Sequence, residues 1–369
     1  MNSIQRLPAS LTPLDVALAV LLRDLVAVAP VELPLSQALG CIAAEMPPAS
    51  AYPPHDVAAV DGWALRSRDL LGASSYTPLP LAAAPPWVEA GDQIPENCDC
   101  VVDADSVDQT GPLVQVLAEA IPGQGIRRAG GHIGAGTLLA EAGRQVLPAD
   151  LLIARATGLE KIAVRRPRLR IVNIPGGAIT ANLITESARG RGAEVIFTEA
   201  PSRDAASIAE AVDADCDLLI TVGGSGVGRT DATIAALARR GEVNAHGIAL
   251  QPGRTAAVGK VGKTPVIALP GAPDQAWAVW WTLAVPALDR LTRRLPQRTV
   301  TLPLARKIAS SVGLAEIVLL ERKGSGWTPL ATGDLPLETM ARADAWLLVP
   351  GGSEGYAAGA QVDAYMLRQ

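Results

Sequence analysis

The stretch LLITVGGSGVGRTD, residues 218–231, is the most informative part of this chain. Its first five residues form an apolar run, which predicts a buried strand. The glycines that follow have no Cβ, so the backbone can turn sharply and lie close to a ligand. A buried strand that opens into a glycine loop and then a helix presents N–H groups to a phosphate. We therefore expect phosphate binding by Gly223, Gly224, Ser225, Gly226 and Gly228.

Two known phosphate motifs do not fit this loop. Residues 223–230 differ from a Walker A sequence at one position, where Arg229 replaces lysine. The planar guanidinium is a poor geometric substitute for the compact lysine ammonium. The G-x-G-x-x-G spacing of dinucleotide-binding folds is not met either. The remaining alternative is a glycine turn that only packs the strand against the next helix.

Apolar segments alternate with helical patterns around this loop, which is typical of parallel βαβ units. Two later loops, QPGR (251–254) and LPGAP (269–273), are expected at neighbouring strand ends, where open α/β sheets bind ligands. The predicted strands lie near 169–174, 193–197, 217–222 and 264–269, and the predicted helices near 179–189, 203–214, 230–240 and 274–291.

The rest of the chain predicts further domains, because 369 residues exceed one ordinary core. Residues 30–45 predict a short hairpin and residues 148–158 a helix. Short strands near 317–320, 346–349 and 362–366 suggest a β-barrel. We expect a helical/linker domain (1–46 plus 145–166), a small β-rich domain (47–144), an α/β domain (167–295) and a C-terminal β-barrel domain (296–369).

Charge and composition argue against several classes of protein. The net charge of −5 disfavours a nucleic-acid surface, which needs clustered positive charge. Asp15, Arg23 and Asp24 interrupt the apolar stretch after Leu11, so we expect neither a signal peptide nor a membrane span. Four cysteines at irregular spacing do not suggest a disulfide framework. A cytoplasmic protein is the simplest interpretation.

Two features leave alternatives open. Trp277, Trp280 and Trp281 fall on one predicted helix and mark either a core or an oligomer face. Cys98 and Cys100 form a C-x-C that is either a metal site or a structural feature. No other Cys or His pair supports the metal site, so the structural interpretation is favoured.

Several ordered motifs resemble those of one family. Residues 49–64 (ASAYPPHDVAAVDGWA) resemble the pattern PPFDNSAMDGYA, and residues 125–133 (GIRRAGGHI) resemble NIRRxGEDI. The three loops described above resemble GGVSVGxxD, KPGKP and LPGNP, in that order. Further matches lie at 307–311, 340–344 and 352–355. Together they are similar to the molybdopterin molybdenumtransferases, the MoeA and gephyrin family, over nearly the whole chain.

The resemblance implies an α/β, multidomain fold with a MogA-like parallel βαβ domain, a small β-rich domain and a C-terminal β-barrel. It also implies an enzyme that inserts molybdate into adenylylated molybdopterin and releases AMP, assisted by Mg²⁺. The family further suggests a homodimer whose site is assembled from both subunits. A molybdoenzyme or a cofactor-insertion protein is a possible partner.

The family match assigns roles to individual residues. Asp61 and Asp231 are expected to be catalytic and to hold the metal ion, because hard cations prefer carboxylate oxygens. Arg254 is expected to bind molybdate or a phosphate through its planar fork. The cofactor pocket is implied to include Asn182, Pro252, Gly253, Pro270, Gly271, Pro273 and Thr339.

This chain departs from the family at several polar positions. Neutral or basic residues replace expected polar or charged ones at Ala90, His132, Gly176, Gln251 and Leu319. These changes favour an alternative, in which the protein is a catalytically weakened molybdopterin carrier or insertion chaperone. A second alternative is an oligomeric scaffold, which the retained Asp61, Asp231 and glycine loop disfavour.

Overall fold

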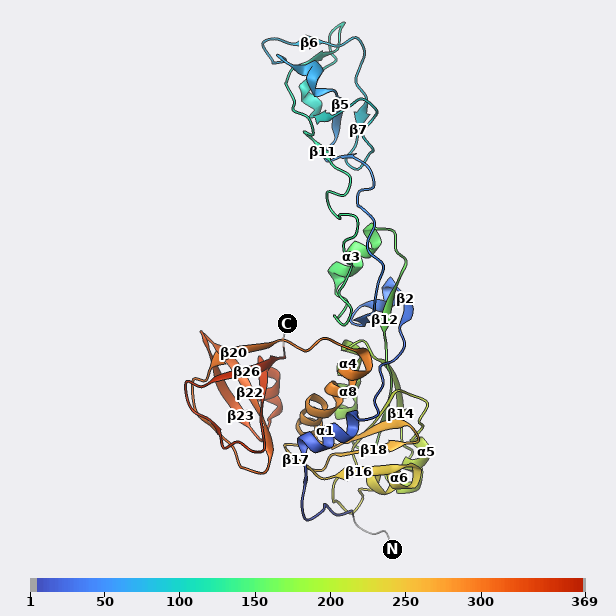
Figure 1. Cartoon of the computed structure of the whole chain (residues 1–369), viewed down its shortest axis with the longest axis vertical. Coiled ribbons are helices and arrows are strands. Elements are labelled where there is room, and N and C mark those ends of the chain that lie inside the picture. Colours follow the sequence, from blue (N-terminus) through green and yellow to red (C-terminus); the bar gives the residue numbers. More distant parts are fainter. Residues whose placement is uncertain (1–4, 368–369) are drawn as a thin grey trace. The chain divides into compact units, whose positions relative to one another are not determined.

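The computed structural model describes residues 5–367, so residues 1–4 and 368–369 of the first and last predicted domains lie outside it. The chain forms two compact units (Figure 1). The larger unit contains Met1–Glu45, Ala142–Leu147 and Ala163–Gln369, and the smaller contains Met46–Glu141 and Pro148–Ile162. The finer division into four domains remains a prediction.

A six-stranded sheet forms the centre of the larger unit, in the order β14-β13-β15-β19-β18-β16. The four predicted strands are present and parallel to one another. Two antiparallel strands, which the sequence analysis did not predict, extend the sheet. The strands are β13 (Arg168–Asn173), β14 (Glu194–Glu199), β15 (Leu218–Val222), β16 (Glu242–His246), β18 (Ala257–Val261) and β19 (Thr264–Leu269).

Helices cover both faces of this sheet, as Figure 1 shows. One face packs against α1 (Leu14–Leu22), α4 (Ala178–Gly190), α7 (Pro273–Val279) and α8 (Val285–Thr292). The other face packs against α5 (Ala205–Ala211) and α6 (Thr233–Arg240). Apolar side chains from both faces of β15 are fully buried, which explains why its sequence is continuously apolar.

The single helix predicted for 274–291 is interrupted. A π-helical segment, η3 (Trp280–Ala284), separates α7 from α8. Pro286 lies in the first turn of α8 and has no backbone N–H to donate to the preceding turn, which favours such a local rearrangement. Trp280 and Trp281 on this segment are 1% and 6% exposed, respectively, so they belong to the core of this unit.

The C-terminal residues form most of a seven-stranded sheet in the order β1-β17-β22-β24-β26-β20, with β23 paired to β22. A single bridge from Leu304 to Trp327 links the β20 and β23 sides, so closure into a barrel remains a prediction. The elements are β1 (Thr12–Pro13), β17 (Ile248–Gln251), β20 (Thr299–Pro303), β22 (Ala315–Lys323), β23 (Gly326–Thr332), α9 (Leu337–Arg342), β24 (Ala345–Val349) and β26 (Gln361–Met366), with a separate pair β21 (Ile308–Ala309) and β25 (Gly355–Tyr356).

The hairpin predicted for 30–45 is wrong. β2 (Val31–Pro34) and β3 (Ile42–Ala43) flank β12 (Lys161–Arg165) and do not pair with each other. The short helix α2 (Leu35–Ala38) lies between them in sequence. This pairing joins residues 31–43 to residues 161–165, two segments that the predicted helical/linker domain also groups together.

The smaller unit consists of short strands around two small cores. Its sheets have the orders β7-β5-β8, β6-β10-β9 and β11-β4. The elements are β4 (Val57–Ala58), β5 (Gly62–Leu65), η1 (Ser67–Leu70), β6 (Leu79–Pro80), β7 (Trp87–Val88), β8 (Cys100–Val102), η2 (Ala104–Ser106), β9 (Val107–Asp108), β10 (Gln115–Val116), β11 (Ile126–Arg127) and α3 (Pro148–Ala156). Among residues 5–367, no helix has the length and apolar character needed to cross a membrane.

Candidate functional site

The glycine loop follows β15 directly and leads into α6, as the sequence predicts. Gly223 and Gly224 have φ angles of 95° and 68°, a region that side chains disfavour. A Cβ on Gly224 would also lie 2.5 Å from Thr233 Oγ1. Glycine is therefore required at position 224 both by the backbone conformation and by the close approach of Thr233.

The carbonyl groups of this loop are hydrogen-bonded to the protein itself. Gly223 O accepts from Thr233 Oγ1 at 2.8 Å, and Gly224 O accepts from Thr233 N at 3.0 Å. Gln5 Nε2 donates to Gly224 O at 3.1 Å and to Gly226 O at 2.8 Å. These bonds fix the orientation of the peptide units in the loop.

Several N–H groups in the middle of the same loop bond no acceptor among residues 5–367, although Gly223 N donates to Leu269 O and Gly228 N to Asp231. Ser225 O lies 2.9 Å from His246 Nε2, which completes the pairing of the carbonyls of residues 223–226. In the described part of the chain, no acceptor bonds the backbone N–H groups of residues 224–227. Ser225 is fully buried and its Oγ has no hydrogen-bond partner in the described structure, whereas Gly226 is half-buried and Val227 is exposed. Free N–H groups in a glycine loop are the arrangement that binds phosphate oxygens.

Gln5 also occupies the beginning of α6. Its Oε1 accepts from Ile234 N at 2.8 Å and from Ala235 N at 3.4 Å. Gln5 therefore satisfies two N–H groups of the first helical turn that would otherwise lack partners. Gln5 was not predicted from the sequence, because nothing in its local sequence distinguishes it.

The LPGAP loop lies beside the glycine loop, since β19 and β15 are neighbours in the sheet. A Cβ on Gly271 would be 3.5 Å from Cα of Gly223. Thr180 Oγ1, from the first turn of α4, donates to Gly271 O at 2.6 Å. Pro270 is buried and Pro273 opens α7, so the prediction that these two loops share one edge of the sheet is confirmed.

The QPGR loop has a different origin from the one predicted. It follows β17, which pairs with β1 and β22 in the C-terminal sheet rather than with β15 or β19. Gln251 Nε2 donates to Gly333 O at 3.0 Å, and Gly253 packs so tightly that a Cβ would be 2.8 Å from Val279 Cγ2. Pro252 is buried, whereas Arg254 is exposed and its guanidinium bonds no described residue.

The remaining pocket candidates lie on helices. Asn182 is exposed on α4, two residues after Thr180. Thr339 is half-buried on α9. Leu319, where the family pattern suggests an arginine, is fully buried in the core between β22 and the helices. That position therefore contributes packing to the protein and no charge to a site.

Asp231 lies at the end of the glycine loop, where both its oxygens have partners. Oδ1 pairs with Arg203 Nη2 at 3.0 Å, and Oδ2 accepts from Gly228 N at 2.9 Å. Arg203 Nη1 also donates to Pro175 O at 2.7 Å. Arg203 was not predicted from the sequence, because it lies 28 residues from Asp231 and matches no motif.

The residues around Asp231 do not fit a divalent cation. A guanidinium already neutralises this carboxylate, and Mg²⁺ needs several free oxygen ligands. Within residues 5–367, no three His, Cys, Asp or Glu side chains gather as a metal site would require. Gly176 and Gly177, which follow β13, contribute no carboxylate.

Asp61 belongs to the smaller unit. It is exposed, and its Oδ1 accepts from Ala90 N at 2.7 Å. The next residue, Gly62, has no room for a side chain, because a Cβ would be 2.1 Å from Val102 O. Asp61 therefore links its segment to the segment at Ala90 within the smaller unit, and its participation in a shared site with Asp231 remains a prediction.

The two motif segments of the smaller unit meet as a single structure. β4 and β11 pair, and the Asp56 carboxylate accepts from Ala129 N at 2.8 Å and from Arg128 Nη1 at 2.6 Å. The bond from the Ala129 backbone, followed by that from Arg128, lowers the pKa of Asp56. His132 is exposed nearby and shows no catalytic partner among the described residues.

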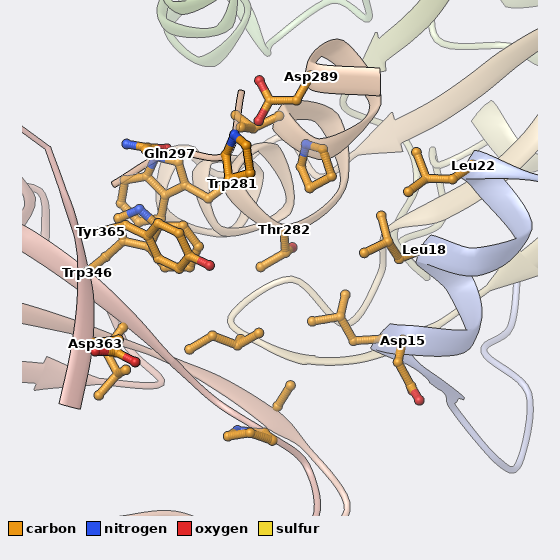
Figure 2. A pocket seen from close by; sticks show the side chains of 18 of the residues that line it. Asp15, Leu18, Leu22, Trp281, Thr282, Asp289, Gln297, Trp346, Asp363 and Tyr365 are labelled. Carbon is orange, nitrogen blue, oxygen red and sulfur yellow. The ribbon is translucent and has the colours of Figure 1, made fainter. Parts of the chain in front are cut away.

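A cavity lies away from these loops, within the larger unit. It measures about 1610 Å³, and none of the predicted site residues lines it. Figure 2 shows Leu18 and Leu22 of α1 on one side and Trp281, Trp346 and Tyr365 on the other. Trp346 stacks on both Trp281 and Tyr365, so aromatic packing borders this cavity.

Comparison with known proteins identifies the family. The model of the MoeA N-terminal region (domain I and II) matches residues 12–158, and a model described as "Probable molybdopterin binding domain" matches residues 179–290. Molybdopterin molybdenumtransferase 2 of Mycobacterium tuberculosis is 30% identical over 313 residues, which cover 72% of this chain and 76% of that protein. Molybdopterin molybdenumtransferase of Synechococcus elongatus is 26% identical over 360 residues, covering 85% and 89%.

Solved structures agree with this comparison. Two molybdopterin biosynthesis MoeA proteins from Pyrococcus horikoshii superpose with TM-scores of 0.70 and 0.67, at 25% and 22% identity. They cover 98% and 97% of this chain, respectively, and 100% of their own chains. Together with the sequence relatives, they show that this chain belongs to the MoeA family of molybdopterin molybdenumtransferases.

Proposed function

We propose that this protein acts in molybdenum cofactor biosynthesis by inserting molybdate into adenylylated molybdopterin with release of AMP. The family supports molybdopterin as the ligand class. The observation that carries the proposal is the glycine loop, whose carbonyls bond the protein while the N–H groups of residues 224–227 have no partner among residues 5–367. Such N–H groups suit the phosphates of an adenylylated ligand.

The proposed roles of the other residues follow from their positions. Arg254, exposed and free of partners in the described structure, is proposed to bind molybdate or a phosphate through two parallel N–H donors. Asp61 is proposed as a carboxylate contributed by the smaller unit. Asn182, Pro252, Gly253, Pro270, Gly271, Pro273 and Thr339 are proposed to shape the pocket around the ligand.

A direct assay tests this function. Purified protein is incubated with adenylylated molybdopterin, with and without molybdate, and AMP is quantified by chromatography. We expect molybdate-dependent release of AMP, together with formation of the molybdenum-containing cofactor. Absence of both products, with the ligand still bound, would replace the enzyme proposal by the carrier alternative.

The carrier or insertion-chaperone alternative is favoured by one specific observation. Both carboxylate oxygens of Asp231 are engaged, and no carboxylate is present at Gly176 or Gly177. Loss of preorganised electrostatic groups typically costs on the order of 10²–10³-fold in rate, whereas loop binding would persist. The assay above, combined with a measured affinity for adenylylated molybdopterin, separates the two functions. Binding with turnover supports the enzyme, and binding without turnover supports the carrier.

The assembly and location are proposed from the family. A homodimer in the cytoplasm would bring Asp61 of one subunit toward the glycine loop of its partner. Multi-angle light scattering at micromolar concentration tests the dimer. A stable monomer that retains full activity would contradict the shared site.

A further inference from the structure

We propose that Arg203 takes the place of Mg²⁺ at the glycine loop: it neutralises the Asp231 carboxylate and donates hydrogen bonds to the ligand, so that the diphosphate binds without a divalent cation. This inference rests on the proposed function, because it concerns the same phosphate site. It replaces a metal-binding role for Asp231 with a guanidinium–carboxylate pair.

The position of Arg203 is fixed from two sides. Its Nη1 donates to Pro175 O at 2.7 Å, just after β13, and its Nη2 pairs with Asp231 Oδ1 at 3.0 Å. The other oxygen of Asp231 accepts from Gly228 N at 2.9 Å. The guanidinium is therefore separated from the loop backbone by a single carboxylate group.

The charge of Asp231 favours a cation at this place. The Asp231 carboxylate touches the loop, and a Cβ on Gly226 would lie 2.6 Å from its Oδ2. Uncompensated, this negative charge would repel a phosphate bound by the neighbouring N–H groups. Arg203 neutralises it without any metal ion, and arginine remains charged at every accessible pH.

Arg203 also retains hydrogen-bonding capacity for a ligand. A guanidinium has five N–H donors, and the bonds above use one on each terminal nitrogen. The side chain is 38% exposed, and its Nε is buried with no hydrogen-bond partner in the described structure. Planar, paired donors match phosphate oxygens better than any other side chain does.

Glycine at position 176 leaves room for this arrangement. Gly176 has a φ of 96°, and a Cβ there would lie 3.3 Å from Arg203 Nη1. A Cβ on Gly177 would be 2.9 Å from Asn173 Oδ1. Arg203 therefore packs against the segment at Gly176, which is the segment that lacks the acidic residues of the family pattern.

The test is calorimetric binding of ADP, which carries an adenylate and a diphosphate, in buffer with EDTA or with millimolar Mg²⁺. We expect wild-type protein to bind ADP with dissociation constants that agree within about threefold in the two buffers. Arg203→Ala should weaken binding by about tenfold or more in EDTA, because a charge-assisted contact and the neutralisation of Asp231 are lost. Arg203→Lys should be intermediate, because it keeps the charge without the fork.

A matched control removes a positive charge elsewhere in the same unit. Arg239 is exposed in the last turn of α6, at the opposite end of that helix from the glycine loop. Arg239→Ala should leave the affinity for ADP within about twofold of wild type. Thermal melts of all variants show whether each remains folded. Asp204, which caps α5 through Ala206 N and Ser207 N, is retained in every variant.

The outcomes separate this inference from the proposed function. Wild-type binding that appears only with Mg²⁺ overturns the role of Arg203 while leaving the phosphate loop in place. Unchanged affinity of Arg203→Ala in EDTA overturns it as well. If wild-type protein binds ADP in neither buffer, the phosphate site itself fails, and the proposed function fails with it.

Discussion

Thr180 Oγ1 donates a 2.6 Å hydrogen bond to the carbonyl oxygen of Gly271. This bond ties the first turn of α4 to the LPGAP loop, which lies against the glycine loop at Gly223. One buried hydroxyl therefore holds two chain segments, about ninety residues apart in sequence, in register at the candidate site.

The first prediction compares two threonines on α4. Thr180→Val should destabilise the protein by about 1–2 kcal/mol and weaken ligand binding, because the Gly271 carbonyl loses its donor. Thr185 is also buried, but its Oγ1 has no partner in the described structure, so Thr185→Val should be neutral or stabilising. Thermal denaturation and ADP calorimetry measure both effects. Equal destabilisation by the two substitutions would contradict the role assigned to the Thr180 bond.

The second prediction concerns the glycine loop. Gly224→Ala should weaken ADP binding by more than about tenfold and cost roughly 1–3 kcal/mol, because φ is positive and Thr233 Oγ1 obstructs the new Cβ. Gly262 is the control, since it has a φ of 60° in the turn between β18 and β19 but nothing within 4 Å of its Cβ position. Gly262→Ala should lower the stability of the protein moderately without affecting the Kd for ADP. An unchanged Kd for Gly224→Ala would remove the loop from the binding site.

The sequence predicted the sheet well because its signals are local. The central parallel strand β15 is almost entirely apolar, β13 and β19 each contain a buried apolar segment, and the glycines after β15 mark the loop. Helix boundaries and strand pairing were less predictable where tertiary contacts override the local sequence pattern. The pairing of β2 and β3 with β12 depends on residues distant in sequence. The π-helical segment at Trp280 has a nearby signal in Pro286, which the apolar pattern of the predicted helix concealed.

The candidate site was only partly predictable for the same reason. Motifs located the glycine and LPGAP loops, but Gln5 and Arg203 reach the loop from distant segments and carry no signature. Asp231 is an acid at the expected position, yet its environment gives it a guanidinium partner. A motif therefore shows where in the chain a site residue lies. The hydrogen-bond or ion-pair partner that determines the chemistry of that residue is set by the fold.

The third prediction concerns acid stability of the smaller unit. Hydrogen bonds from Ala129 N and Arg128 lower the pKa of Asp56 in the folded protein. A depressed pKa stabilises the fold above the unfolded value of about 3.9, and this stabilisation is lost as pH falls through the lower folded value. The protection factors for hydrogen exchange across residues 125–131, corrected for the intrinsic rate at each pH, should therefore fall below about pH 4. Asp56→Asn should cost at most about 1 kcal/mol at neutral pH, since the pair is partly exposed, and should flatten this acid dependence.

The fourth prediction concerns the C-x-C sequence. Burial raises the pKa of the Cys100 thiol to about 11, and this thiol donates to Leu65 O. Thiolate is the reactive form, so Cys100 should resist iodoacetamide at pH 8 until the protein is denatured, while the partly exposed Cys98 reacts faster. Mass spectrometry of alkylated peptides measures both rates. Rapid modification of Cys100 in folded protein would contradict the buried position.

The last prediction concerns the aromatic stack that joins the helices to the C-terminal sheet. Trp346 lies 5.2 Å from Trp281 on η3 and 4.7 Å from Tyr365 on β26, measured between ring centroids, with interplanar angles of 9° and 22°. Trp346 is 7% exposed, so Trp346→Ala should cost about 3–5 kcal/mol through lost burial and a cavity. Trp346→Phe should cost less, because an aromatic face remains on both sides. Trp87 in the smaller unit is 44% exposed, and Trp87→Ala should cost about 1 kcal/mol or less. If Trp346→Ala and Trp87→Ala shift the melting temperature equally, the stack is not what attaches the sheet to the helices.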